Sequence, residues 1–249
     1  MAYTRPATTL TPALIIYLID ASHSMNDPCG STTKIAVVNQ GLKEAIKDMI
    51  CRSMRGGIVQ NRYKVAILAY STTVVDVLNG ICDLPDLAKL GVPTISAGSE
   101  TNTEVGFSAV EKLLSAHLAE FQTSPAPLVC HLTDALMTLG DPTPIIRRIQ
   151  AMQVQDGSVL VEHVYVADQM LKKPVQDWEQ WEGVTKARQL TNKYARLLFR
   201  LASPLPESYR QNINSYGYHL QQNAALFFPG LHMELVRLAF AISSATRLI

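Results

Sequence analysis

The chain has 249 residues, which allows one large α/β domain or two small ones. With 47% hydrophobic and 17% charged residues, it can bury a sizeable core and is not a disordered chain. Its 22 lysines and arginines nearly balance 21 aspartates and glutamates, and a formal net charge of +1 gives no global attraction to nucleic acid or to an anionic membrane. The polar start MAYTRPATTLTP and the short apolar run after it predict neither a secretory signal nor a membrane span.

Strand and helix patterns alternate from the start of the chain. The apolar run 13–19 predicts a strand, and residues 34–53 predict a helix with its apolar residues on one face. Residues 31–33, Ser-Thr-Thr, offer an N-cap for this helix, and the pair Gly56-Gly57 offers a C-cap. The chain thus opens with a strand–helix unit.

The middle of the chain continues the alternation. The segments YKVAILAY (63–70) and VVDVL (74–78) predict two strands, and the second ends in the turn pair Asn79-Gly80. Residues 103–121 predict a second long helix, because their apolar residues recur at helical spacing.

Three further elements define the fold class. The segment PLVCHLTD (127–134) is almost continuously apolar, as is typical of the centre of a parallel sheet. A short helix begins at Thr143-Pro144, with proline in its first turn, and VLVEHVYVAD (159–168) predicts the next strand. The alternation predicts an α/β fold with a Rossmann-like, doubly wound, mostly parallel central sheet flanked by helices.

The pattern changes after Asp168. Residues 185–201 predict a helix, 203–211 a proline-punctuated turn, and 232–247 a terminal amphipathic helix that packs back on the core. We therefore predict a single domain over residues 11–249, made of a core (11–168), a C-terminal helical elaboration (169–230) and the terminal helix.

The four cysteines lie far apart and include no CxxC pair. A zinc site and a disulfide framework are therefore not expected. Cys130 stands inside an apolar strand and is expected to be a small core residue. With reduced thiols and no N-terminal signal, we expect a soluble cytoplasmic protein.

Oxygen-bearing side chains follow two of the predicted strands. The sequence LIDASHSM places Asp20, Ser22 and Ser24 at alternate positions where the first strand ends. Asp134 follows the apolar run LVCHLT, and Thr101 lies in the polar segment SETNTE before the second long helix. Ligands of an open α/β sheet bind outside the carboxyl ends of its strands, so three loops can bring these five donors together. Such a set, without sulfur or imidazole, selects a hard cation such as Mg²⁺ or Mn²⁺.

This arrangement resembles the metal-ion-dependent adhesion site of von Willebrand factor A domains, whose pattern is DxSxS, a threonine in a TNT-like loop and an aspartate in a TDG-like strand end. His23 and Ala135 stand where glycine is common in that pattern, and neither change removes a ligand. The resemblance covers roughly residues 11–168, and the C-terminal third resembles the extension of bacterial TerY-type proteins. It implies that the serines bind the ion directly and the aspartates partly through water. It also implies that Thr101 becomes a direct ligand when a partner docks.

Some neighbouring residues have simpler interpretations. An aspartate and two serines after a strand often form only a turn and a helix cap. Thr103 is expected to be a helix N-cap that supports the site rather than a ligand. His131, in mid-strand, is expected to be a hydrogen-bonded core or rim histidine, whereas His23 is a candidate contact at the rim.

Four other polar or aromatic residues are assigned structural roles. Trp178 and Trp181 suit packing, although an exposed pair would be a natural interface anchor. Asp27 and Asp141 are expected to be loop and cap residues.

The sequence favours a binding module without turnover. In this interpretation a protein partner contributes a Glu or Asp to the metal, and the resemblance suggests bacterial stress or conflict signalling with protein kinase or phosphatase partners. The alternative is a Mg²⁺-dependent phosphohydrolase-like enzyme in which Asp20 is the nucleophile. Such enzymes normally carry a second aspartate two residues later as the acid/base, and Ser22 occupies that position here. The sequence also contains no GxxxxGK[ST] loop and no GxGxxG after the first strand.

Overall fold

The computed structural model describes residues 3–134, 140–167, 170–230 and 233–244. Its centre is a mostly parallel sheet with strand order β13-β12-β9-β1-β6-β7, and β8 also pairs with β6. The strands of this sheet are β1 (Ala13–Asp20), β6 (Tyr63–Tyr70), β7 (Val74–Asp76), β8 (Cys82–Asp83), β9 (Leu128–Thr133), β12 (Leu160–Tyr165) and β13 (Phe227–Pro229). Strands β7 and β8 run antiparallel to β6, and the other pairs are parallel.

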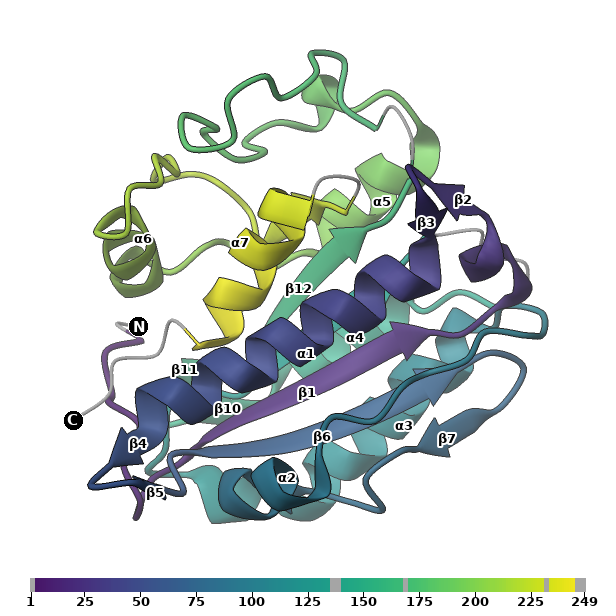
Figure 1. Cartoon of the computed structure of the whole chain (residues 1–249). Helices are drawn as coiled ribbons and strands as arrows, with labels where there is room; N and C mark the ends of the chain where they lie inside the picture. The colour runs from purple at the N-terminus through teal and green to yellow at the C-terminus, as the bar shows by residue number, and fades with distance from the viewer. Residues whose placement is uncertain (1–2, 135–139, 168–169, 231–232, 245–249) are drawn as a thin grey trace.

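Helices cover both faces of the sheet (Figure 1). The α-helices of the described residues are α1 (Lys34–Ser53), α2 (Leu84–Leu90), α3 (Thr103–His117), α4 (Thr143–Ala151), α5 (Lys193–Leu201), α6 (Glu207–Asn214) and α7 (Met233–Ser244). Short 3₁₀ helices are η1 (His23–Asn26), η2 (Leu118–Phe121) and η3 (Ala187–Gln189). Three small hairpins are β2 (Pro28–Cys29) with β3 (Thr32–Thr33), β4 (Met54–Arg55) with β5 (Ile58–Val59), and β10 (Gln153–Val154) with β11 (Gly157–Ser158).

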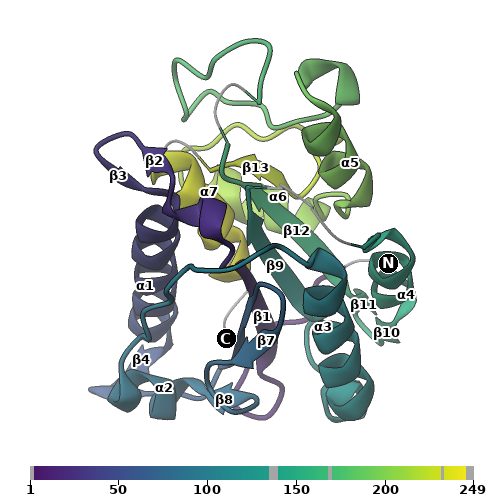
Figure 2. The same ribbon diagram turned by 90° about the vertical axis from the view of Figure 1, so that its right-hand side faces the viewer.

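The side chains of β1 alternate between two apolar cores. One core contains residues of α3 and α4 together with Leu14, Ile16 and Leu18, and the other contains residues of α1 and α7 together with Ile15, Tyr17 and Ile19. Both faces of the strand are buried, and this explains why its sequence is continuously apolar. Figure 2 shows α1 and α3 on opposite sides of the sheet. The predicted Rossmann-like, doubly wound fold is confirmed.

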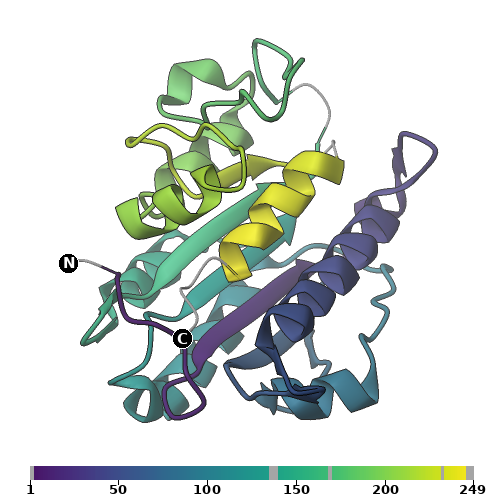
Figure 3. The same ribbon diagram turned by 60° about the vertical axis from the view of Figure 1, so that its left-hand side comes forward.

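Helix α7 lies beside α1 on one face of the sheet (Figure 3). A glycine allows this close approach, because a Cβ on Gly41 would lie 2.7 Å from Cγ1 of Val236 and would also overlap Phe240. The ring of Phe240 reaches the sheet, with its centroid 5.6 Å from that of Tyr17. The predicted terminal helix is therefore present at 233–244, and the remaining residues of the range 232–247 lie outside the described part of the chain.

The proline-punctuated turn predicted over 203–211 is wrong. Helix α6 begins at Glu207, and Pro206 precedes it as the N-cap residue in an extended conformation. Prolines before a helix start do not interrupt it. Glu207 also pairs with Arg210 one turn later, at 2.5 Å, which supports the first turn.

The helix predicted over 185–201 is shorter than expected. Residues 187–189 form only the single turn η3, and α5 begins at Lys193. The side chain of Asn192 accepts a hydrogen bond from the backbone N–H of Ala195 at 2.8 Å, so asparagine sets the start of the helix.

The C-cap predicted at Gly56-Gly57 is also wrong. Met54 follows α1 in an extended conformation, and the two glycines form the turn of the β4–β5 hairpin with φ of +55° and +78°. The hairpin needs these left-handed conformations, which glycine adopts without strain. The other predicted strands and helices are present with small shifts in their bounds, whereas α2, β8, β13, η1 and the small hairpins described above were not predicted.

The segments at both ends of the chain contribute to the same body. Backbone N–H groups of Thr4 and Arg5 each donate to Oδ1 of Asp156 at 2.9 Å, so residues before position 11 are tied to the β10–β11 hairpin. Strand β13, from the C-terminal elaboration, extends the central sheet beside β12. In the described residues, no helix combines the length and apolar character needed to cross a membrane.

A chain truncated after residue 168 is expected to be insoluble or much less stable than the full chain. The truncation removes β13 and α7, whose Leu235, Leu238 and Ala239 are fully buried, and so exposes one apolar face of the sheet. Urea unfolding of both chains measures the difference. A soluble truncated chain with the unfolding free energy of the full chain would contradict the prediction of a single domain.

Candidate metal centre

The two predicted carboxylates lie at the carboxyl ends of adjacent strands. Asp20 is the last residue of β1, Asp134 directly follows β9, and these strands pair in parallel. The chain leaves β1 toward β6 on one side and returns to β9 on the other, so the strand order reverses between β1 and β9. Open α/β sheets bind ligands at such a reversal. In Figure 2 this end of the sheet faces the viewer.

The loop after β1 gathers its own oxygen atoms. The backbone N–H of Ser22 donates to Oδ1 of Asp20 at 2.9 Å. The hydroxyl oxygens of Ser22 and Ser24 lie 3.2 Å apart and share a hydrogen bond. Asp20 and Ser22 are buried, and Ser24 is half-buried. The chain then turns into η1, so the three predicted ligands lie at one tip.

The third predicted loop is fastened to the first. Ser99 forms a parallel bridge with Ser22, and its carbonyl oxygen accepts a hydrogen bond from the N–H of His23 at 2.6 Å. Thr101 follows two residues later and is 3% exposed. The three loops that carry the five predicted ligands therefore meet at one end of the sheet.

The N-cap predicted at Thr103 is one residue too late. The cap of α3 is Asn102, whose side-chain oxygen accepts a hydrogen bond from the N–H of Val105 at 3.2 Å. Asparagine ranks above threonine as a capping residue, and the threonine is instead buried as the first residue of the helix.

A buried row of hydrogen bonds holds Asp20 on the side that faces the core. The hydroxyl of Thr133, on the neighbouring strand, donates to Oδ2 of Asp20 at 2.7 Å, and the hydroxyl of Tyr70 lies 3.3 Å from the same oxygen. The row continues from Tyr70 to Nε2 of His131 at 2.8 Å, and from Nδ1 of His131 to Nδ1 of His163 at 2.9 Å. His131 is thus a hydrogen-bonded core histidine, as predicted.

Burial decides the charges in this row. It raises the pKa of the Asp20 carboxyl, while hydrogen bonds from Ser22 and Thr133 oppose the shift and the charge of Asp134 adds to it. Burial also holds the pKa of His131 well below its ordinary value and lowers that of His163 to about 3. Both imidazoles are therefore neutral near pH 7 and supply no positive charge to the carboxylates.

Lys34 supplies a positive charge that the sequence analysis missed. Its ammonium nitrogen lies 2.8 Å from Oδ2 of Asp134 and 3.3 Å from Oδ2 of Asp27. Burial lowers the pKa of this ammonium, but the hydrogen bonds and charges of Asp134 and Asp27 raise it above its ordinary value overall. A lysine at the first position of a helix opposes the helix dipole, and this signal could have indicated a carboxylate partner.

The donor set fits a hard divalent cation. The described residues contain no group of three or more His, Cys, Asp or Glu side chains placed to hold a metal. A metal at this site would therefore rest on two carboxylates and three hydroxyls, which are the oxygen ligands that Mg²⁺ and Mn²⁺ accept. The ammonium of Lys34 is already paired with one of these carboxylates, Asp134, so the site attracts a cation.

The rim of the site is polar and exposed. His23 and Asn26 are exposed, and the side-chain amide of Asn26 donates to the carbonyl of Ala97 at 3.2 Å. Ala135 and Leu136, which follow the last ligand in sequence, lie outside the described residues. Beside the loop of Ser22, a hollow of about 460 Å³ is lined mainly by aliphatic residues and serines between positions 69 and 99, together with Ala21.

Two predicted structural roles agree with the observed contacts. Trp178 and Trp181 are half-buried, and their rings lie 5.6 Å from Tyr218 and 5.8 Å from Phe228. Oδ1 of Asp141 accepts a hydrogen bond from the N–H of Thr143 at the start of α4, at 2.9 Å. The two tryptophans therefore serve packing.

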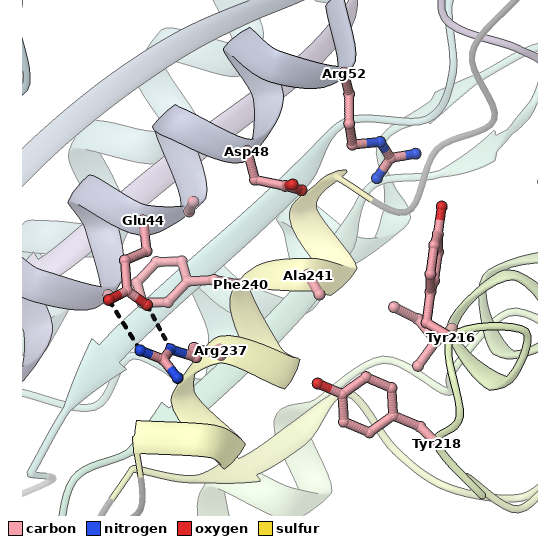
Figure 4. A pocket seen from close by; sticks show the side chains of 11 residues that line it. Glu44, Asp48, Arg52, Tyr216, Tyr218, Arg237, Phe240 and Ala241 are labelled. Atoms are coloured by element: carbon pink, nitrogen blue, oxygen red, sulfur yellow. Dashed lines mark hydrogen bonds and ion pairs between the residues drawn. The ribbon is translucent and has the colours of Figure 1, made fainter. Parts of the chain in front are cut away.

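Another hollow, of about 470 Å³, lies away from this site between α1, α7 and the segment 213–218 (Figure 4). The carboxylate of Glu44 and the guanidinium of Arg237 form two hydrogen bonds at its edge, at 2.6 and 3.2 Å. Tyr216 and Tyr218 border it from the opposite side in Figure 4. The predicted metal ligands do not line this hollow, so it is separate from the candidate site.

No protein-family model matches the sequence, and no curated protein matches it either. Solved structures do have a similar fold. The pilus adhesin SpaC from Lactobacillus rhamnosus GG matches with a TM-score of 0.60 and 12% identity, over 97% of this chain and 31% of the adhesin. An aerotolerance-related membrane protein from Bacteroides fragilis matches with a TM-score of 0.50 and 12% identity, over 84% of this chain and 90% of that one.

A third similar structure is described as a vWF domain. It belongs to the type V pili tip protein Mfa5 from Porphyromonas gingivalis and matches at 16% identity over 51% of this chain and 39% of that one. Its TM-score of 0.40 is too low to carry an argument. At these identities the likeness concerns the fold alone, a mostly parallel sheet flanked by helices.

Proposed function

We propose that this protein is a metal-dependent protein–protein interaction module. Asp20, Ser22, Ser24, Thr101 and Asp134 hold Mg²⁺ or Mn²⁺, and the ion binds a Glu or Asp side chain of a protein partner. The observation that carries this proposal is the burial of two carboxylates at the ends of adjacent parallel strands, where the strand order reverses and a cation is already attracted.

The charges of the site support an acidic partner. Two carboxylates neutralise a divalent ion, and the ammonium of Lys34, which also contacts Asp27, leaves no excess of negative charge around it. An ion that also keeps an exchangeable coordination position therefore favours an anionic ligand from outside. A carboxylate from a partner meets this need with the same oxygen chemistry that holds the ion.

The biological setting is proposed from the sequence resemblance. We place the module in the cytoplasm of a bacterium, in stress or conflict signalling with kinase or phosphatase partners. In the described part of the chain the four cysteines form no disulfide with one another, which is the pattern expected in a reducing compartment.

Removing either carboxylate is expected to abolish tight metal binding. Asp20→Ala and Asp134→Ala should each weaken Mn²⁺ binding about 100-fold or more, because the ion loses one of its two charged ligands. Calorimetric titration measures the affinities, and Asp141→Ala, which removes an aspartate that accepts a hydrogen bond at the start of α4 and is not a predicted ligand, is the matched control. Circular dichroism should show folded protein for all three variants. Unchanged Mn²⁺ affinity in both ligand variants would rule out this site.

Partner binding is expected to need both the ion and one acidic residue. EDTA should release the partner from the immobilised protein in a host lysate, and Asp20→Ala should capture none. Replacing Ser22 and Ser24 together by alanine should weaken capture without unfolding the protein, since the hydroxyls bind the ion without carrying charge. Once a partner is identified, alanine at a single Glu or Asp should abolish binding. A partner that binds equally well in EDTA would show that another surface makes the interaction.

We expect no phosphatase or ATPase turnover from the purified protein with Mg²⁺. Asp20 is fully buried, and its two oxygens accept hydrogen bonds from Ser22 and Thr133, which leaves it poorly placed for attack on a phosphate. Release of phosphate that disappears in Asp20→Ala would instead favour the phosphohydrolase alternative.

A further inference from the structure

We propose that Lys34 is an internal cation that competes with the metal ion for Asp134 and thereby sets how tightly the domain holds its ion. This inference rests on the metal site proposed above. It starts from one contact, in which Nζ of Lys34 lies 2.8 Å from Oδ2 of a predicted metal ligand. An ammonium and a divalent ion cannot both make full use of the same carboxylate.

The Lys34–Asp134 pair is much more buried than the Lys64–Asp83 pair. The side chain of Asp134 is 1% exposed and that of Lys34 is 14% exposed, whereas the corresponding values for Lys64 and Asp83 are 29% and 38%. Charges that are this far removed from water are screened little by solvent or salt. The ammonium therefore acts on the site far more strongly than an exposed lysine would.

The position of Lys34 offers it a second carboxylate. Nζ also lies 3.3 Å from Oδ2 of Asp27, whose side chain is 55% exposed at the rim of the site. An entering ion can therefore take over Asp134 while the ammonium keeps its contact with Asp27. The lysine is held by these two carboxylates and not by the helix dipole, which disfavours a cation at the start of α1.

This arrangement has opposite effects on the empty and the occupied site. In the absence of metal, Lys34 compensates the buried charge of Asp134 and keeps two neighbouring carboxylates compatible with a folded domain. When the ion is present, the ammonium repels it and lowers its affinity. The same positive charge attracts the carboxylate of the partner, so the occupied site is completed by partner binding rather than by a third protein carboxylate.

Mn²⁺ titration of the full chain, followed by the EPR signal of free Mn²⁺, tests the competition. Lys34→Met should bind Mn²⁺ at least about tenfold more tightly than the wild-type chain, because it keeps most of the side-chain volume and loses the charge. Lys34→Arg retains the charge and should stay close to wild type. Lys64→Met removes a comparable lysine–aspartate pair, at 2.6 Å, that does not involve a predicted ligand, and should leave the affinity unchanged.

Thermal unfolding in EDTA and in Mn²⁺ provides a second, independent measurement. In EDTA, Lys34→Met should unfold at a lower temperature than wild type, because the buried carboxylate of Asp134 loses the ammonium that pairs with it. Added Mn²⁺ should raise its unfolding temperature by more than it raises that of wild type, in proportion to the tighter binding. A Lys34→Met chain that folds only in the presence of Mn²⁺ would be the strongest form of the expected result.

The outcomes separate this inference from the proposed function. If wild type binds Mn²⁺ and Lys34→Met binds it equally or more weakly, the competition is refuted while the metal site stands. The competition is also refuted if Lys34→Met is as stable as wild type in EDTA, or folds in neither condition, because the ion should replace the ammonium. If neither chain binds Mn²⁺, the metal site itself is refuted, and this inference with it.

Discussion

Two carboxylates buried at the carboxyl ends of the adjacent central strands β1 and β9 are the constraint on which the rest of the site depends. A buried charge destabilises a fold unless hydrogen bonds or opposite charge compensate it. Asp20 receives its compensation from the hydroxyl of Thr133 and the backbone of Ser22, whereas Asp134 receives the ammonium of Lys34. Asp20 and Asp134 are close because of the strand order. The chain forms β6 on one side of β1 and then places β9 on the other side, so β1 and β9 end next to each other.

The packing of helix α3 against the sheet limits how the two buried carboxylates can be compensated. Helix α3 packs so closely over the sheet that a Cβ on Gly106 would lie 2.8 Å from Cγ of Tyr70. Tyr70 in turn lies within hydrogen-bonding distance of Asp20 and of His131, and Phe107 packs edge-on against that imidazole at 4.9 Å. Tyr70 and His131, on the core side of Asp20, are thus fixed by close packing and are neutral. Any cation that balances the two carboxylates must approach from the loop side, where the serines and Lys34 lie.

The sequence was sufficient to place Asp20 and Asp134 at strand ends, because a long apolar run followed by a polar residue marks where a buried strand stops. It could not identify Thr133 or Tyr70 as supports, since their contacts with Asp20 depend on which strands are neighbours and on their register. Lys34 was missed for a related reason, because its partner Asp134 lies 100 residues away. Strand β13 was not predicted because it has only three residues and forms a strand by pairing with β12.

The C-terminal elaboration does more than cover the sheet. The side-chain amide of Asn192, which caps α5, lies 3.4 Å from the hydroxyl of Tyr165 at the end of β12. Burial raises the pKa of that tyrosine, the hydrogen bond from Asn192 opposes the shift, and the charge of Asp134 adds to it, so the hydroxyl lies within the electrostatic reach of the site. Tyr194 belongs to the same surroundings, with the ammonium of Lys193 5.0 Å from the centre of its ring. The elaboration therefore contributes Asn192 and Tyr194 to the surroundings of Tyr165, the core residue that links it electrostatically to Asp134.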